Sequence, residues 1–146
     1  MKIDKVIDLY NKCIADTYRR YPVVLVKGRG IKVWDSEGKE YYDFVSGIAV
    51  NNLGHCHPQI TNALKKQAGE LIHVSNLYYT LPQVEMAKLL TKKSFADKVF
   101  FCNSGAEGIE AALKFARARA AAKGMPGRDI VAFRGGFHGR TGFAVS

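Results

Sequence analysis

Two short segments rich in small residues contain the groups that could do chemistry. The first, Asn103-Ser104-Gly105-Ala106-Glu107, lies between an apolar strand pattern and a long alanine-rich helix pattern. Backbone N–H groups at a helix start, aided by the helix dipole, favour a phosphate, and small residues let it approach. Ser104, Gly105 and Ala106 are therefore candidate phosphate-binding residues. A serine N-cap followed by a glycine turn is the purely structural alternative.

The second segment, Gly135 to Thr141, places an aromatic ring and a guanidinium three residues apart. It follows another strand pattern, and open α/β sheets bind ligands beyond the carboxyl ends of their strands. Phe137 could stack on a flat cofactor, and the planar fork of Arg140 suits a carboxylate. A phenylalanine that pins its loop beside a solvated arginine is the structural alternative. Together, the two segments indicate a site for a phosphorylated cofactor and an amino acid.

Two acidic residues, Glu107 and Glu110, fall in the first turns of the helix pattern. Favourable placement near the positive end of the helix dipole, with salt bridges, is the preferred interpretation. A supporting role near the cofactor is the alternative.

A third segment, Gly54-His55-Cys56-His57-Pro58, resembles a metal cluster. Alternate positions in a short loop seldom converge on one ion, and no partner ligands follow at the usual spacing. We therefore expect no metal site here. The segment is interpreted as a turn that enters a helix at Pro58.

The elements that must position these residues follow from hydrophobic periodicity. Helices are expected over residues 3–17, 58–72, 82–90 and 105–123. Strands over 23–26, 31–35 and 40–44 form an antiparallel meander, with turns at 27–30 and 36–39, and residues 46–57 form a loop. Strands 98–102 and 129–133 flank a helix, which is a βαβ pattern and predicts a parallel sheet. The fold class is therefore α/β.

Length and composition limit the function classes. The chain has 146 residues, 47% of them hydrophobic, which predicts a packed globular protein. No apolar run approaches the roughly 18 residues that span a bilayer, and the N-terminus lacks a signal-peptide core. Three widely spaced cysteines fit a reducing compartment, so we expect a cytosolic protein without membrane contact. The net charge of +9 is spread along the chain, so we expect no nucleic-acid partner.

In their order along the chain, these motifs resemble the class III (ornithine-type) aminotransferases. The resemblance rests on residues 101–107, 136–141 and 54–58, and on Tyr21-Pro22-Val23 through Gly38. It covers nearly the whole chain. It implies the N-terminal portion of the fold type I transferases that use pyridoxal 5′-phosphate (PLP). Residues 1–54 would belong to a small domain with a helix and a β-meander, and residues 55–146 would begin the large cofactor-binding domain and its parallel sheet.

The resemblance also implies roles for individual residues. Gly105 and Ala106 would donate backbone N–H groups to the PLP phosphate, with Ser104 beside them, and Phe137 would stack on the pyridine ring. Arg140 would hold the substrate α-carboxylate. Two further residues, Tyr18 and Ile48, would lie near the substrate. Ile48 stands where ornithine-specific members carry a tyrosine, which favours N²-acetylornithine over ornithine.

The implied reaction transfers an amino group between N²-acetylornithine and 2-oxoglutarate in arginine biosynthesis, in a homodimer with sites at the subunit interface. The family's catalytic lysine, which forms a Schiff base with the cofactor, and the aspartate that partners its pyridine nitrogen are expected beyond Ser146. We therefore expect no catalytic residue within these 146 residues and no activity of this chain alone.

Three alternatives remain open. Within the class, the substrate could be ornithine, 4-aminobutyrate or succinyl-diaminopimelate. In another class, the chain would be a non-catalytic remnant or dimerisation module that lacks the lysine. A nucleic-acid binder is supported by the charge alone.

Overall fold

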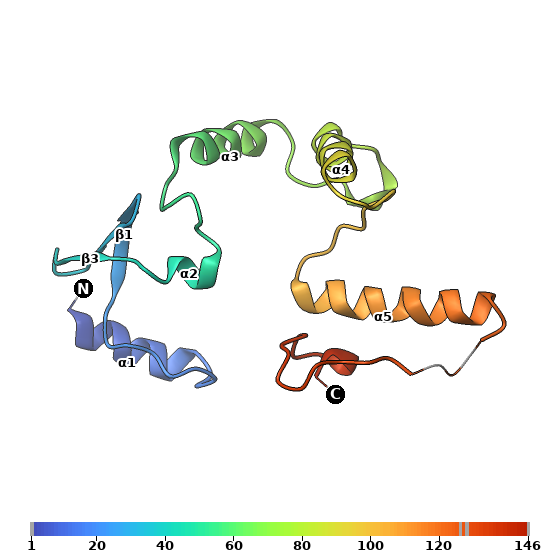
Figure 1. Ribbon diagram of the computed structural model, residues 1–146. Helices are drawn as coiled ribbons and strands as arrows, with labels where there is room; N and C mark the ends of the chain where they lie inside the picture. Colours follow the sequence, from blue (N-terminus) through green and yellow to red (C-terminus); the bar gives the residue numbers. More distant parts are fainter. Residues whose placement is uncertain (1, 126, 128, 146) are drawn as a thin grey trace. The chain divides into compact units, whose positions relative to one another are not determined.

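The computed structural model describes residues 2–125, 127 and 129–145. The chain forms two compact units, Met1–Leu77 and Tyr78–Ser146 (Figure 1). The predicted boundary at residue 54 concerns the domains of the family's fold, and it stays a prediction.

A helix and a three-stranded antiparallel sheet of order β1-β2-β3 open the first unit. The helix stops earlier than the predicted residue 17 because the backbone is extended at Ile14. The first strand was misplaced: its pairing runs to Arg29, and the chain reverses at Gly30, where φ is +58°. These elements are α1 (Ile3–Cys13), β1 (Leu25–Arg29), β2 (Lys32–Asp35) and β3 (Glu40–Tyr42).

The hairpin between β2 and β3 forms where the sequence predicts it, and one carboxylate closes it. Asp35 Oδ1 accepts hydrogen bonds from the backbone N–H groups of Glu37 and Lys39, each at 2.9 Å. Its Oδ2 accepts one from the Tyr41 hydroxyl at 2.7 Å. The Tyr41 hydrogen bond is the main reason that the pKa of Asp35 lies below its usual value. Asp35 is only 4% exposed, so its three hydrogen bonds hold the turn from a buried position.

The rest of the first unit contains one predicted helix and one turn that the sequence did not predict. α3 (Pro58–Glu70) begins with proline in its first turn, as expected. α2 (Ser46–Ala49) lies in the predicted loop, and all four of its residues have positive φ angles of 51° to 63°. It is therefore a left-handed turn. The unit ends with η1 (Ser75–Leu77).

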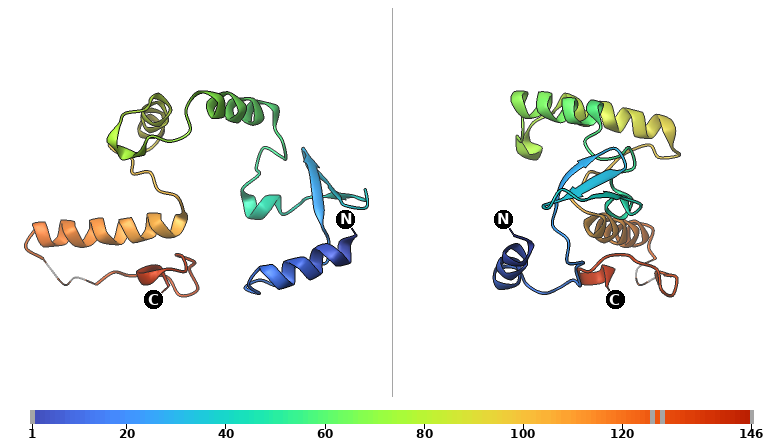
Figure 2. Two further views of the ribbon diagram at one scale, coloured as in Figure 1. Left: turned by 180° about the vertical axis from the view of Figure 1, so that it is seen from behind. Right: turned by 90° about the vertical axis from the view of Figure 1, so that its left-hand side faces the viewer.

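The second unit is built on two helices, α4 (Leu81–Lys93) and α5 (Gly105–Ala122). Both start within a residue of the predicted positions, and α4 continues three residues past the predicted end. A short 3₁₀ turn, η2 (Gly142–Ala144), packs on α5. Figure 2 shows the last segment running alongside α5 in the view from behind.

The two strands predicted beside α5 are not formed: the described residues of 98–102 and 129–133 take part in no β-ladder. Segment 98–102 instead contacts α5 through Phe100, whose ring meets that of Phe115 edge-on at 5.9 Å. Parallel strands require neighbouring strands and cover on both faces. Within the described residues these two segments have no neighbouring strand with which to pair, which is the physical reason that the predicted strands are absent.

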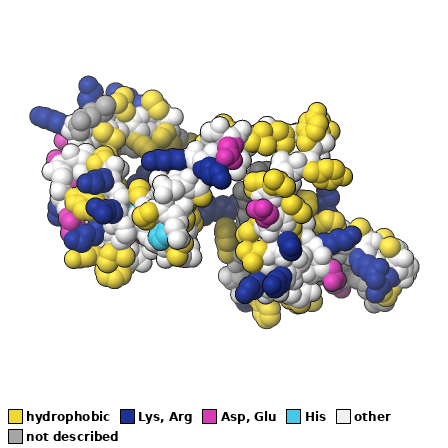
Figure 3. Space-filling model, turned by 90° about the horizontal axis from the view of Figure 1, so that it is seen from above, with side chains coloured by type: hydrophobic (Ala, Val, Ile, Leu, Met, Phe, Trp, Pro, Cys, Tyr) yellow, Lys and Arg dark blue, Asp and Glu magenta, His cyan; other side chains and the backbone are white. Residues whose placement is uncertain are grey.

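Apolar side chains cover much of the surface of both units. Among the described residues, Val33, Asp35 and Ala144 are buried. On the face in Figure 3, yellow apolar side chains alternate with scattered Lys and Arg. Large apolar side chains are therefore exposed in both units.

None of the helices formed by the described residues has the length and apolar character that a membrane crossing requires.

Candidate cofactor and substrate site

The start of α5 has the features of an anion site. Ser104 caps the helix, its Oγ accepting a hydrogen bond from Glu107 N–H at 3.2 Å. Glu107 turns back and accepts one from Asn103 N–H at 2.6 Å, a variant of the capping box. Within the described residues, the N–H groups of Gly105 and Ala106 have no hydrogen-bond partner. Two helix-start donors are thus available for a phosphate.

The glycine-rich loop reaches this helix start. A Cβ built on Gly139, where φ is +140°, would lie 3.0 Å from Ala106 Cβ and 2.9 Å from Ala144 Cβ. Only glycine permits so close an approach, because real Cβ contacts of this length force neighbouring atoms to shift. The structure therefore brings together the two segments that the sequence separates by some thirty residues.

Phe137 and Arg140 lie on this loop, on either side of Gly139. The Phe137 ring is 78% exposed, and the Arg140 guanidinium carbon lies 5.8 Å from its centroid. An exposed ring on a loop that reaches the helix-start amides fits a flat phosphorylated cofactor, and the guanidinium near that ring fits a carboxylate. The residues present are thus chemically suited to PLP and an amino acid, although their individual roles remain predictions.

Glu110, one helical turn after Ala106, contacts the same loop. Its Oε1 accepts hydrogen bonds from Thr141 Oγ1 at 3.2 Å and from Ala144 N–H at 3.3 Å. These contacts join Glu110 to the loop, and the preferred interpretation, favourable placement near the helix dipole with salt bridges, stays a prediction. Contacts across thirty-one and thirty-four residues leave no local signal in the sequence, so a supporting role for Glu110 was predicted only as an alternative.

The two remaining candidate residues, Tyr18 and Ile48, belong to the first unit. The Tyr18 carbonyl accepts a hydrogen bond from Arg20 Nη1 at 2.9 Å. Ile48 lies in the left-handed turn α2 with φ of 59° and is 87% exposed. A β-branched residue in this region is an outlier that costs roughly 1–2 kcal/mol. Such strain is found preferentially at functional positions.

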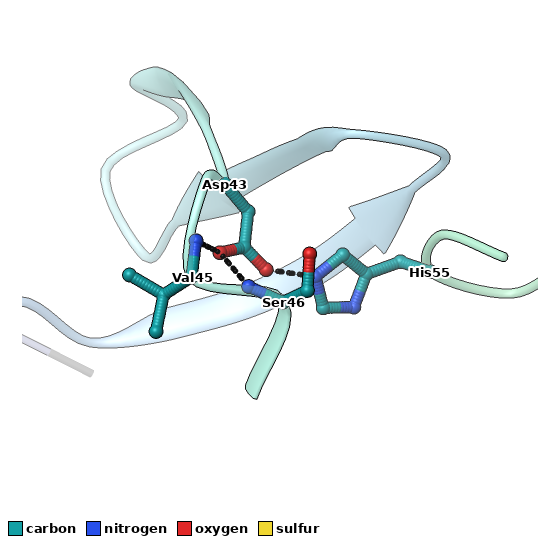
Figure 4. A network of polar contacts seen from close by, with 4 residues as sticks. All are labelled: Asp43, Val45, Ser46 and His55. Atoms are coloured by element: carbon teal, nitrogen blue, oxygen red, sulfur yellow. Dashed lines mark hydrogen bonds and ion pairs between the residues drawn. The ribbon is translucent and has the colours of Figure 1, made fainter. Parts of the chain in front are cut away.

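Asp43 and His55 hold the turn that carries Ile48 (Figure 4). Asp43 Oδ1 accepts hydrogen bonds from the N–H groups of Val45 at 2.9 Å and Ser46 at 2.8 Å, and its Oδ2 lies 2.6 Å from His55 Nε2. The backbone of His55 also pairs with Gly30 in an isolated antiparallel bridge. His55 thus joins the meander to the strained turn. This structural role was not predicted from the His-Cys-His segment in which His55 lies.

The Asp43 network predicts a pH-dependent stability. The His55 contact, with the backbone donors, lowers the pKa of Asp43 below the ordinary 3.8. The charged carboxylate therefore stabilises the fold above about pH 3.8, and this contribution disappears as the pH falls through the lowered pKa. In thermal unfolding of the intact protein, Asp43→Asn should have a lower Tm than the unmodified protein at pH 7. This difference in Tm should become smaller as the pH falls below 3.8. A Tm difference that does not change with pH, and that equals the difference for the exposed control Asp8→Asn, would contradict this.

Comparisons with known proteins show the family of the chain. Residues 13–146 match the family Aminotransferase class-III. An acetylornithine aminotransferase of Caldanaerobacter subterraneus is 56% identical over 131 residues, which cover 89% of this chain and 33% of that protein. The solved N-acetylornithine aminotransferase of Stenotrophomonas maltophilia is 46% identical with a TM-score of 0.82, covering 91% of this chain and 36% of the other.

An ornithine aminotransferase of Toxoplasma gondii, solved with partial occupancy of PLP at its active site, is 33% identical with a TM-score of 0.82. That match covers 86% of this chain and 30% of the other. The chain spans about a third of the length of the curated relatives it matches. The matched family, the identity to its members and the shared fold lead to one conclusion: this chain belongs to the class III aminotransferases.

Proposed function

We propose that the intact protein, meaning the natural product that contains these 146 residues, is a PLP-dependent aminotransferase. It would transfer an amino group between N²-acetylornithine and 2-oxoglutarate, a step of arginine biosynthesis. The observation that carries the proposal is the close approach of Gly139 to Ala106, which joins the loop that carries Phe137 and Arg140 to a helix start whose Gly105 and Ala106 N–H groups have no partner among the described residues. Membership of the family supports the class of reaction.

Each group in this site has a separate task. The N–H groups of Gly105 and Ala106 bind the cofactor phosphate, and Ser104 fixes the helix start from which they project. Phe137 covers one face of the pyridine ring and keeps water from it. Arg140 binds and orients the substrate carboxylate. PLP, when bound, supplies the electron sink that allows an amino group to be moved.

The preference for N²-acetylornithine rests on the names of the curated relatives and on Ile48. An isoleucine offers no hydroxyl to a free α-amino group, so it suits the acetylated α-nitrogen of N²-acetylornithine better than the charged α-amino group of ornithine. Ornithine, 4-aminobutyrate and succinyl-diaminopimelate are the alternative donors. Measurement of kcat/KM for all four donors with 2-oxoglutarate tests the proposal. N²-acetylornithine should give the highest value, and a higher value for another donor would reassign the substrate.

Replacing Phe137 by alanine should weaken PLP binding by about fivefold to tenfold, because an aromatic contact contributes about 1 kcal/mol beyond its buried area. Equilibrium titration of the intact apoprotein with PLP measures this change. Phe95→Ala is the matched control, since Phe95 is fully exposed in the same unit and outside the site. Equal PLP affinity in both variants would remove Phe137 from the cofactor site.

We also propose that the intact protein is a cytosolic homodimer. The exposed apolar surface supports further covering by protein, and three free, exposed cysteines suit a reducing compartment. A mass by sedimentation equilibrium equal to one subunit would contradict the dimer.

A further inference from the structure

One face of α5 contacts the glycine-rich loop and the η2 turn that follows it at several points along the helix. Ala106, Glu110 and Arg117 lie four and seven residues apart and therefore share a face. Gly139 packs on Ala106, and the Arg117 guanidinium carbon lies 5.1 Å from the Phe143 ring centroid. Between these contacts, Glu110 supplies the side-chain hydrogen bonds that join α5 to the loop within the described residues. The loop is thus fastened at three points, and the middle one is polar.

The Glu110 contact is close and geometrically restrictive. Both hydrogen bonds end on a single oxygen, Oε1, and Glu110 itself is half-buried. A Cβ built on Gly142 would lie 2.9 Å from that oxygen, which shows how closely the loop backbone approaches the end of the Glu110 side chain. Ala144, whose N–H is one of the donors, is buried. Any movement of the 141–144 turn away from α5 must break these bonds.

We propose that Glu110 is a positioning residue for the cofactor and substrate site. By holding Thr141 and Ala144, it fixes the loop so that Phe137 and Arg140 stay beside the helix start. It does not itself touch the cofactor. This inference rests on the proposed function, because it concerns the geometry of that same site.

Two roles for Glu110 predict different results. If its charge interacts favourably with the helix dipole, both Glu110→Gln and Glu110→Ala should weaken the binding of PLP and glutamate, because both remove the charge. If it holds the loop, Glu110→Gln should be nearly normal, because its side-chain carbonyl still accepts both hydrogen bonds. Glu110→Ala should be impaired in either case. The glutamine variant therefore separates anchoring from electrostatics.

The experiment uses the intact protein and measures the PLP dissociation constant, the KM for glutamate, kcat and Tm. Glu110→Ala should raise both the PLP dissociation constant and the KM by about tenfold, and Glu110→Gln should stay within about threefold. Thr141→Val, which removes one donor at nearly constant shape, should give an intermediate increase. Glu85→Ala on α4 controls for loss of an exposed acidic side chain. If the alanine variant does not fold, the comparison of Glu110→Gln with Thr141→Val still distinguishes anchoring of the loop from interaction with the helix dipole.

Two outcomes would overturn the inference. One is a lower Tm for Glu110→Ala with unchanged PLP affinity and KM, which would leave Glu110 a purely structural residue. The other is equal impairment of Glu110→Gln and Glu110→Ala. Failure of the proposed function is a distinct result, since the unmodified protein would then neither bind PLP nor turn over glutamate.

Discussion

Replacing Arg140 by alanine in the intact protein is expected to raise the KM for glutamate about 100-fold while leaving the amount of bound PLP nearly unchanged. Arginine binds a carboxylate through two charge-assisted hydrogen bonds, and losing them costs about 2.7 kcal/mol, a factor of about 100. The cofactor keeps its contacts at the start of α5. Steady-state kinetics with glutamate and absorbance of the bound cofactor measure the two effects.

Two matched variants make the Arg140 result specific. Arg140→Lys keeps the charge but loses the planar fork. It should therefore restore only part of the affinity for glutamate that Arg140→Ala loses. Arg119→Ala removes an arginine from the last turn of α5, away from the site, and should leave the KM unchanged. If Arg140→Ala has the KM of the unmodified protein, the assignment of the substrate carboxylate to Arg140 is wrong.

Gly139→Ala is expected to weaken PLP binding by tenfold or more and to destabilise the loop by about 1–3 kcal/mol. The added methyl group would lie 2.9 Å from Ala144 Cβ and 3.0 Å from Ala106 Cβ. The loop must therefore move away from the helix start, and Phe137 moves with it. PLP titration and thermal unfolding of the intact protein measure these effects.

Gly135→Ala is the matched control for backbone strain. Gly135 also has a positive φ, +76°, but a Cβ there would meet no atom within 4 Å. Both variants impose a strained backbone conformation on alanine, and only Gly139→Ala adds a steric conflict with α5. Equal PLP affinities in the two variants would show that the close approach of the loop to Ala106 has no functional importance.

Local signals in the sequence predicted the elements that have local causes. The turn at 36–39 follows from its glycine and polar residues, and Asp35 closes it with bonds to residues two and four positions away. α5 starts after the Ser104 cap, and α3 starts at Pro58, because each start depends on adjacent residues. Motif order likewise predicted the family, which the comparisons confirm.

Features that depend on distant residues were not predictable. Periodicity contains no information about the pairing of Asp43 with His55, twelve positions apart, or of Glu110 with Thr141, thirty-one apart. The left-handed turn at Ser46–Ala49 contradicts the intrinsic preference of its non-glycine residues, so propensity predicted only a loop. Strands 98–102 and 129–133 were predicted from apolar runs, but a parallel ladder needs partners that these runs do not supply.

The most direct test of the account is a single half-reaction. The intact protein is loaded with PLP, and its visible absorbance is recorded before and after glutamate is added without any oxo acid. We predict that the absorbance of the bound cofactor changes in proportion to the enzyme present and returns when 2-oxoglutarate is supplied. If the protein binds PLP but glutamate leaves its absorbance unchanged, the site does not perform transamination with glutamate, and the central claim is contradicted.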